Sequence, residues 1–408
     1  MKKRIKWKTI IVLILVLALI GGGTTFGIMY YNDNIKVEDA TVKKPVKVNA
    51  VEEPKIEEYS FSFVGVGDAL LHNGVYYDAA TGQIGSDGYQ LYNFKKMLTY
   101  IKPIVKNYDL AFYNQETIIG GKHIGLTSYP CFNSPDEIGL DMIDAGFNIV
   151  NLASNHTIDR GSGGAEYSRK FWNNQKNVLA IGSYDSFKDR DTPEIKEING
   201  ITYAMLAYTY GTNGIPVPSG KEYLVNVWPM DYNADYGVGY EAYKAQVKKD
   251  IEAIRGKVDV LMVSMHWGVE YTHTPTSYQK DAAKYLASLG VDVIIGHHPH
   301  VIQPIEFIND TLVIYSLGNF ISAQEGTMKR VGMIAGFTVN KTVNEGEVTI
   351  DITDVKADLI WTHHNWYHNF EVIPFNKLND SILPGYQSIY NEYKPIITQY
   401  SKDVTVGI

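Results

Sequence analysis

Three of the chain's 11 histidines stand within four positions, in the run Gly296-His297-His298-Pro299-His300. The run directly follows residues 291–295, an apolar stretch of the length and composition of a buried strand. Protonated imidazoles this close together repel one another, whereas a divalent metal ion takes neutral imidazole nitrogens as ligands. We therefore expect a fold that brings further metal ligands to the end of this strand.

Other residues of ligand type also stand at or near the ends of apolar stretches. They are spread from residue 68 to residue 266: Asp68, His72, Asn114, Glu116, Asn155, His156 and His266. The carboxyl ends of strands in an open α/β sheet form one edge, and ligands bind there. Carboxylate, amide and imidazole groups together suit Mn, Zn or Fe, and a bridging carboxylate can hold two ions about 3.5–4 Å apart. The pattern predicts a divalent metal site, with two ions, at a strand edge.

The N-terminus predicts a membrane anchor. Five basic residues within the first eight positions precede residues 9–32, which carry no charged side chain. About 20 apolar residues in a helix span the hydrocarbon layer of a bilayer, and basic residues before the span place the N-terminus in the cytoplasm. A cleaved signal peptide is the alternative, but the apolar stretch is long for one and no A-x-A site follows. The expected organisation is a basic tip and anchor at 1–32 and an extended stalk at 33–58.

Charge and cysteine content narrow the function classes. The formal net charge is −8, so we expect no binding of nucleic acid through bulk charge. Cys131 is the only cysteine, which excludes an intrachain disulfide and argues against a structural zinc site with thiolate ligands. Both observations fit an extracytoplasmic domain with a large hydrophobic core.

The body of the chain, 59–375, alternates apolar strands with helical patterns, which is typical of an α/β fold. A C-terminal extension, 376–408, shows no clear pattern. Two kinds of element are predicted in the body. Strands are expected at 108–113, 147–152, 202–208, 258–265, 291–295 and 311–316, with antiparallel β-structure at 332–340 and 348–359. Helices are expected at 134–145, 166–177, 240–255 and 277–289.

Six motifs in order, VGVGDALLH, FYNQE, NLASNHTIDRG, HWGVEY, GHHPHVIQ and YSLGNF, resemble the poly-γ-glutamate capsule biosynthesis family of the CapA type. The resemblance covers residues 59–375 and includes the membrane anchor. It implies a layered αββα sandwich of the calcineurin-like metallophosphoesterase type, preceded by one transmembrane helix. It also implies a component that makes, exports or anchors poly-γ-glutamate or a related anionic envelope polymer, with capsule synthase subunits and the membrane as partners.

The resemblance also assigns metal ligands. Asp68 corresponds to the first ligand aspartate, and His298 and His300 match the paired H-x-H. Glu116 stands where phosphoesterases have a bridging aspartate, and it could bridge two ions or hold one. Asn155 resembles the amide ligand of the second ion. Phosphoesterases have a histidine two residues after this aspartate, whereas His72 follows Asp68 by four residues. This spacing leaves metal coordination and a hydrogen-bonding role equally open for His72.

Further roles follow around these ligands. His266 ends an apolar strand and is a predicted ligand, and His297 is expected to face away from the site. His156 would be the acid that protonates the leaving group or stabilises developing charge. Asp159 would orient it, with a plain turn residue before Gly161 as the alternative. Residues expected to contact substrate or shape its pocket are Asn114, Trp267, Glu270, Tyr271, Asn319 and Arg330, although a solvated surface position is an alternative for Arg330.

Three functions are consistent with this reading. The first is a metal-dependent, hydrolase-like protein that acts on a γ-glutamyl polymer. The second is a non-catalytic scaffold of the polymer synthase complex. The third is an exported metallophosphoesterase acting on nucleotides or teichoic acids. The longer carboxylate at Glu116 and the shifted His72 mean that specificity for phosphate esters does not carry over from the superfamily.

Overall fold

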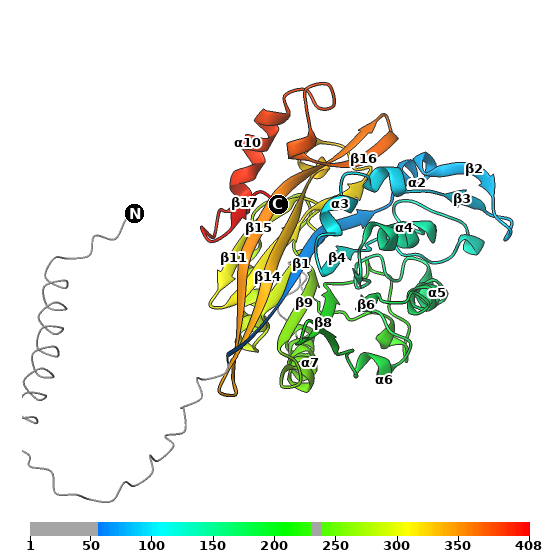
Figure 1. Cartoon of the computed structure of the whole chain (residues 1–408). Helices are drawn as coiled ribbons and strands as arrows, with labels where there is room; N and C mark the ends of the chain where they lie inside the picture. Colours follow the sequence, from blue (N-terminus) through cyan, green and yellow to red (C-terminus); the bar gives the residue numbers. More distant parts are fainter. Residues whose placement is uncertain (1–55, 230–237) are drawn as a thin grey trace, which may run out of the picture. The chain divides into compact units, whose positions relative to one another are not determined.

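The computed structural model describes residues 56–229 and 238–408. These residues form two sheets that share a hydrophobic core, with helices against the outer face of each sheet (Figure 1). In this part of the chain, no helix has the length and apolar character needed to cross a membrane. The predicted anchor and nearly all of the predicted stalk lie outside the described residues.

The larger sheet has nine strands in the order β16-β15-β14-β1-β4-β5-β6, with β13 beside β1 and β17 beside β15. Strands β1, β4, β5, β6 and β13 are parallel to their neighbours in that group, whereas β14, β15 and β16 are antiparallel. The strands are β1 (Ile56–Leu70), β4 (Leu110–Asn114), β5 (Ile149–Asn151), β6 (Leu179–Ile181), β13 (Asn319–Ser322), β14 (Val331–Asn344), β15 (Glu347–Asn365), β16 (His368–Pro374) and β17 (Thr405–Val406).

The smaller sheet has six strands in the order β11-β12-β10-β9-β8-β7, of which β8, β9, β10 and β12 run parallel. Its strands are β7 (Lys196–Ile198), β8 (Ile201–Thr209), β9 (Val260–His266), β10 (Val293–His297), β11 (Ile302–Ile308) and β12 (Thr311–Leu317). A separate pair is formed by β2 (Ala80–Ile84) and β3 (Gln90–Tyr92).

Helices connect the strands and cover the sheets. The α-helices are α2 (Asn73–Asp78), α3 (Lys102–Val105), α4 (Glu137–Ala145), α5 (Gly161–Asn173), α6 (Phe187–Arg190), α7 (Val238–Arg255), α8 (Ser277–Ser288), α9 (Thr327–Arg330) and α10 (Tyr386–Ile397). The 3₁₀ helices are η1 (Lys95–Leu98), η2 (Lys122–Ile124), η3 (Glu222–Leu224) and η4 (Phe375–Lys377).

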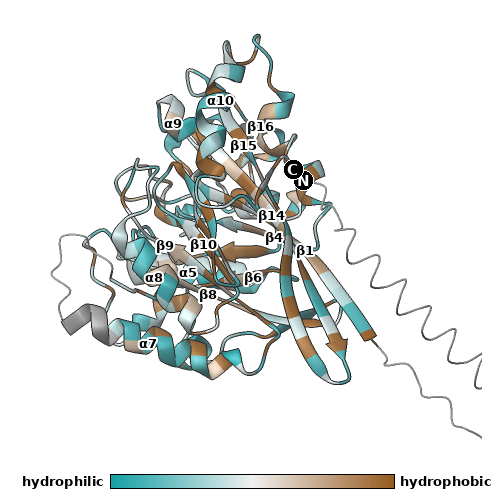
Figure 2. Ribbon diagram, turned by 90° about the vertical axis from the view of Figure 1, so that its left-hand side faces the viewer, coloured by the Kyte–Doolittle hydropathy of each residue, from teal (hydrophilic) through white to brown (hydrophobic). Residues whose placement is uncertain are grey.

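The hydrophobic core has a layered arrangement. One cluster contains inward-facing residues of both sheets, such as Phe63 of β1 and Met262 of β9. A second packs the opposite face of β1, β4 and β5 against helices that include α4 and α5, and a third packs β8 and β9 against α7 and α8. Figure 2 shows the corresponding pattern, with hydrophobic residues gathered on the central strands and hydrophilic residues on α8.

Burial along β1 explains why its sequence changes character. From residue 56 to residue 60 exposed and partly buried side chains alternate, because one face of the strand is still open to solvent. From Phe63 onward every residue is buried, since the second sheet covers one face and helices cover the other. The apolar run that ends at Asp68 is therefore a strand buried on both faces.

Most predicted elements of the body are present, with shifted ends. The helix expected at 166–177 begins earlier, at Gly161, because the glycine-rich turn belongs to its first turns. The helix expected at 134–145 begins at Glu137, and Gly146 at φ 114° ends it. Residues 376–408 form η4, α10 and β17, and Ile397 and Val404 are buried in the core between the sheets.

Two glycines allow close backbone contacts at β12 and the turn after it, Gly67 between the two sheets and Gly296 within the smaller sheet. A Cβ on Gly67 would lie 1.8 Å from the backbone oxygen of Gly318, and a Cβ on Gly296 would lie 1.9 Å from the backbone oxygen of Tyr315. The backbone N–H of Asp68 donates to the same Gly318 oxygen, at 2.9 Å. Only glycine permits this approach, which fixes the end of β1 beside the end of β12.

Candidate metal centre

The register of the parallel strands brings the predicted ligands to one edge. Asp68 of β1 lies beside Asn114 of β4 and Asn319 of β13, and in the smaller sheet His266 of β9 lies beside His297 of β10. The polar residues of both sheets therefore gather where their parallel strands end, as expected for open α/β sheets.

Ligand-type side chains form three groups at this edge. In each group, one possible ligand atom per residue lies within 4.8 Å of the others. The groups are Glu116 with His266 and His298, Asp68 with Glu116 and His300, and Glu270 with His298 and His300. Glu116, His298 and His300 each belong to two of these groups, so the groups overlap and Glu116 joins the one with His266 to the one with Asp68.

Glu116 is the most informative residue of the site. It is fully buried, and within the described residues neither carboxylate oxygen has a hydrogen-bond partner. Its Oε1 lies 3.5 Å from His300 Nε2 and 3.7 Å from His266 Nε2. Burial, together with the charge of Asp68, raises the pKa of Glu116 well above its usual value. A buried carboxylate without a partner is costly unless a cation is bound, so this residue fits a metal ion.

Asp68 is held in place by neighbouring side chains. Its Oδ1 accepts a hydrogen bond from Asn114 Nδ2 at 2.8 Å, and its Oδ2 accepts one from His300 Nδ1 at 3.1 Å. Asn114 is oriented in turn by Asn151, whose Nδ2 donates to Asn114 Oδ1 at 2.8 Å. Burial alone would raise the pKa of Asp68, but the His300 hydrogen bond and charge bring it below the usual value. Asp68 is therefore an ionised, oriented carboxylate.

His298 and His300 are presented by a strained backbone. Both are buried, with φ values of 94° and 56°, which non-glycine residues rarely adopt. His300 Nδ1 donates to Asp68 and to Asn319 Oδ1, at 3.0 Å, so its Nε2 is the atom that points toward Glu116. Such outer hydrogen bonds are typical of metal-binding imidazoles.

The protonation of these two histidines differs. Burial and the charge of His300 lower the pKa of His298 to about 3, so its ring is neutral at pH 7. Burial alone would lower the pKa of His300, but the charges of Glu116 and Asp68 raise it to about 9. A bound ion would have to displace the proton from His300, as metals do when they bind imidazole.

His266 and Asn155 lie on the other side of Glu116. His266 Nε2 donates to Asn155 Oδ1 at 3.0 Å, so these two predicted ligands contact each other directly. Burial, followed by the charges of the other histidines, lowers the pKa of His266 well below its usual value. A neutral imidazole beside an amide oxygen is a suitable donor pair for a divalent ion.

His156 lies next to Asn155 in the chain, and its ring contacts Asp159, in one of the two roles that the sequence left open for that residue. Its Nδ1 donates to Asp159 Oδ2 at 2.7 Å, and that oxygen also accepts from the backbone N–H of Phe132 at 2.7 Å. The pairing keeps the proton on Nδ1 and orients the ring. Asn213 Nδ2 approaches the same nitrogen at 3.4 Å.

The structure does not bring His72 into any of the three ligand groups. His72 precedes α2, its Nδ1 lies 3.2 Å from the backbone oxygen of Leu70, and its ring packs edge-on against Phe132 at 5.2 Å. Of the two roles left open by the sequence, its position supports the hydrogen-bonding one. The spacing of four residues after Asp68 carries the side chain past the end of the strand.

His297 was expected to be structural and to face away from the site, but it lies beside Asp68. It is fully buried, its Nδ1 is 3.8 Å from Asp68 Oδ1, and neither ring nitrogen has a hydrogen-bond partner among the described residues. Its ring stacks on Phe112 at 5.3 Å. His297 is therefore a close neighbour of the centre, although it belongs to none of the three ligand groups.

The predicted substrate contacts separate into two kinds. Asn114 and Asn319 are fully buried and orient Asp68 and His300, so they support ligands and are closed to substrate. Glu270 is exposed beside His298 and His300, which places it where the centre meets solvent.

Trp267 and Arg330 do not fit a substrate-contact role. Trp267 is fully buried in the core beneath α7 and α8, and its indole N–H donates to the Tyr315 oxygen at 2.9 Å. Arg330 donates through Nε to the Thr362 oxygen at 2.9 Å and through Nη2 to the His364 oxygen at 3.2 Å. These hydrogen bonds hold the guanidinium on β15.

Two residues that the sequence did not single out complete the site. The ring of Tyr210 lies 4.6 Å from that of His298 and parallel to that of His266, at 6.3 Å. Asn213 accepts a hydrogen bond from Asn155 Nδ2 at 3.2 Å. Both follow β8 directly, so the strand-end rule that identified the ligands also pointed to this loop.

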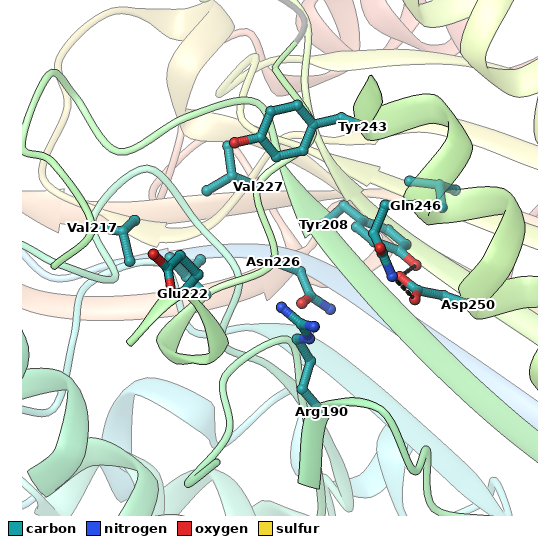
Figure 3. Close-up of a pocket in the computed structure, with 11 residues that line it drawn as sticks. Arg190, Tyr208, Val217, Glu222, Asn226, Val227, Tyr243, Gln246 and Asp250 are labelled. Atoms are coloured by element: carbon teal, nitrogen blue, oxygen red, sulfur yellow. Dashed lines mark hydrogen bonds between the residues drawn. The ribbon is translucent and has the colours of Figure 1, made fainter. Parts of the chain in front are cut away.

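A separate cavity of about 110 Å³ lies between α6, β8 and α7 and shares no residue with the ligand groups (Figure 3). Its wall includes the half-buried carboxylate of Asp250. Tyr208 donates to Asp250 Oδ2 at 2.9 Å and Gln246 Nε2 to Asp250 Oδ1 at 2.6 Å, while Arg190 points into the same cavity. The polar groups here satisfy one another, in contrast to those around Glu116.

Comparisons with known proteins identify the family of the chain. Residues 62–324 match the family described as "Bacterial capsule synthesis protein PGA_cap". The chain is 29% identical over 310 residues to "PGA biosynthesis protein CapA" of Bacillus subtilis, covering 74% of this chain and 75% of that protein. It is 30% identical over 184 residues to "Capsule biosynthesis protein CapA" of Bacillus anthracis, covering 45% and 42%. A shorter match, 31% over 68 residues, covers 17% of this chain and 18% of a "Probable polyglutamine synthesis accessory protein" of Mycobacterium tuberculosis.

Proposed function

The chain belongs to the bacterial capsule synthesis protein (PGA_cap) family, and on that basis we propose that it takes part in poly-γ-glutamate capsule synthesis. In this proposal a metallophosphoesterase-like domain uses a divalent metal centre to act on a γ-glutamyl polymer, its transfer or its release. The family resemblance predicted from the six sequence motifs is confirmed by the match.

The observation that carries the metal proposal is the buried carboxylate of Glu116, whose oxygens have no partner among the described residues. The donors around it are Asp68, Asn155, His266, His298 and His300. We expect Mn, Zn or Fe, with two ions sharing Glu116. When bound, such ions polarise a carbonyl and supply hydroxide at neutral pH.

The remaining chemistry belongs to the chain's own side chains. The Asp159 hydrogen bond keeps a proton on Nδ1 of His156, so Nε2 is the atom that would pass a proton to a departing amine. Asn114, Asn151 and Asn319 keep Asp68 and His300 from rotating. Glu270 and Tyr271 stand at the rim, where the polymer would enter.

We also propose that residues 1–32 anchor the protein in the cell membrane with the folded domain outside the cytoplasm. The support is the sequence itself: basic residues followed by an uncharged apolar stretch long enough to span a bilayer. Capsule synthase subunits in the same membrane are the expected partners. Protease treatment of intact cells should digest the domain if this orientation is correct, and a fully protected domain would contradict it.

The first experiment measures metal. The purified full-length protein is exposed to Mn²⁺ or Zn²⁺, dialysed and analysed for bound ions, alongside a variant with His298→Ala. We expect retained metal in the natural protein and its loss in the variant with the fold intact by circular dichroism. Failure of the natural protein to retain any ion would contradict the metal proposal.

The second experiment separates catalysis from scaffolding, to which the word "accessory" in the name of the mycobacterial relative points. Cells that lack the gene are complemented with the natural protein or with a variant carrying Asp68→Ala, Glu116→Gln and His298→Ala. Loss of capsule with normal protein levels is expected from a catalytic centre. Normal capsule would establish the scaffold. Rapid hydrolysis of bis-p-nitrophenyl phosphate would favour the third function, an exported phosphoesterase.

A further inference from the structure

The metal centre meets solvent at Tyr271 and Glu270. The backbone N–H of Tyr271 donates to the Pro299 oxygen at 2.7 Å, within the histidine run, and the Tyr271 ring lies 6.1 Å from the ring of His300. Gln324 Nε2 donates to the Tyr271 hydroxyl at 3.1 Å. The Tyr271 ring, 40% of which is exposed, is thus fixed between the histidine run and the loop that leads into α9.

Lys329 of α9 is held at the same place. Its backbone oxygen accepts a hydrogen bond from Asn319 Nδ2 at 2.9 Å, and the other end of that amide binds His300. Its Nζ lies 4.9 Å from the centre of the Tyr271 ring, a cation–π contact. In the part of the chain that the structure describes, no carboxylate lies within ion-pair distance of this ammonium group. The mouth of the centre therefore carries a positioned cation without a counter-ion.

The charges around the centre explain why such a cation is useful. Glu270 is an exposed carboxylate at the mouth, and the carboxylates of Asp68 and Glu116 lie buried behind it. The folded chain is acidic overall, with a net charge of −8 for the full sequence. A polymer that carries a carboxylate on every unit would meet the negative charge of Glu270 at the entrance, and a cation beside Glu270 offsets that repulsion. An aromatic ring holds Lys329 there while leaving its N–H donors available for a substrate carboxylate.

We propose that Lys329, supported by the Tyr271 ring, binds a free carboxylate of an anionic, amide-linked polymer next to the bond held at the metal centre. This inference rests on the proposed function and extends it by naming the residue that selects an anionic chain. Lys329 acts as a specificity-determining residue, and Tyr271 positions it.

The test uses the full-length protein in detergent, loaded with Mn²⁺, and two ligands: a short γ-linked glutamate oligomer and its fully methyl-esterified, uncharged form. Three variants are compared with the natural protein. Lys329→Met removes the charge, Lys329→Arg keeps it, and Lys356→Met removes an exposed lysine of β15 as a matched control. Bound metal and melting temperature are measured for each, because neither should change if Lys329 acts only on the ligand.

We expect Lys329→Met to weaken binding of the charged oligomer about tenfold, the size of one lost charge-assisted contact, and to leave binding of the ester unchanged. Lys329→Arg and Lys356→Met should bind the charged oligomer as the natural protein does. Equal binding of the charged oligomer by natural protein and Lys329→Met would overturn the assignment while the proposed function stands. If the metal-loaded natural protein binds neither ligand, the γ-glutamyl function itself fails and the assignment fails with it.

Discussion

Two carboxylates, the fully buried Glu116 of the ligand cluster and the half-buried Asp250 of the cavity in Figure 3, are in opposite situations. Neither oxygen of Glu116 has a partner among the described residues, whereas both oxygens of Asp250 accept hydrogen bonds, from Gln246 and Tyr208. Burial raises the pKa of both carboxyls. The difference teaches that the polar groups in the wall of an open cavity can satisfy one another without a ligand. A closed cluster with unsatisfied atoms is the one that requires a ligand.

The largest effect is expected from Glu116→Gln, which keeps the size of the side chain and removes its charge. We expect metal affinity to fall by about 100-fold or more, since even outer-shell changes cost 10–100-fold. Asp250→Asn is the matched change in the cavity and should leave metal affinity as it is. Isothermal titration with Zn²⁺ measures both, and equal affinities in the natural protein and Glu116→Gln would remove the distinction between the two sites.

Metal removal should lower the stability of the folded protein only where the ligand cluster around Glu116 is intact. Saturating Mn²⁺ at about 1,000 times its dissociation constant stabilises the folded state by about 4 kcal/mol, and EDTA abolishes this gain. We expect the natural protein and Asp250→Asn to lose several degrees of melting temperature on chelation, as measured by differential scanning calorimetry. Glu116→Gln should lose almost nothing, and a full EDTA effect in that variant would place the ion elsewhere.

A smaller change is expected when the cavity carboxylate loses one partner. Tyr208→Phe leaves Asp250 Oδ2 without its hydrogen bond. A buried acceptor left unsatisfied costs about 1–3 kcal/mol, and we expect the lower end of this range because Asp250 is half-buried. Urea unfolding measures the change, and Tyr243→Phe, on an exposed tyrosine of the same cavity, is the control. No loss in Tyr208→Phe would mean that Asp250, like Glu116, has a free coordination position.

The smallest effect is a pH dependence from Asp250. Its pKa is raised in the folded state, mainly by burial, so its contribution to stability is fully present below the unfolded-state pKa and is lost as pH rises through the folded-state pKa. The difference in unfolding free energy between the natural protein and Asp250→Asn should therefore decrease from about pH 4 upward. A difference that increased over this range would show that the folded state stabilises the charged form.

The strand-end rule predicted the convergence of Asp68, Glu116, His266, His298 and His300, because parallel strands place such residues at one edge whatever lies between them. Two other placements had to come from the structure. The position of His297 was inferred from an extended backbone, but His298 and His300 have positive φ values, so side chains do not alternate in this run. Arg330 donates hydrogen bonds to backbone carbonyl groups of β15. This contact joins segments that are distant in the sequence, so no local sequence pattern predicts it.

Trp267 is a different case, because its position was predictable. It follows His266 at the end of β9, and the alternation of side chains along a strand directs it to the opposite face, toward the helices. The same rule that supports His266 as a ligand excludes its neighbour from the pocket. Glu270, which lies beyond the strand, falls outside that rule and reaches the rim.

The contact of Gly67 and Gly296 with the chain near residue 318 has a consequence for genetics. Even a methyl group would collide with backbone atoms, at Gly67 with those that join the two sheets and at Gly296 with those of the neighbouring strand β12. A saturation-mutagenesis screen for capsule loss should therefore score these glycines as intolerant as the histidines, although they bind nothing. Protein abundance, measured for each allele, would distinguish the two classes of variant. Glycine variants should lower the amount of folded protein, whereas histidine variants should leave it unchanged.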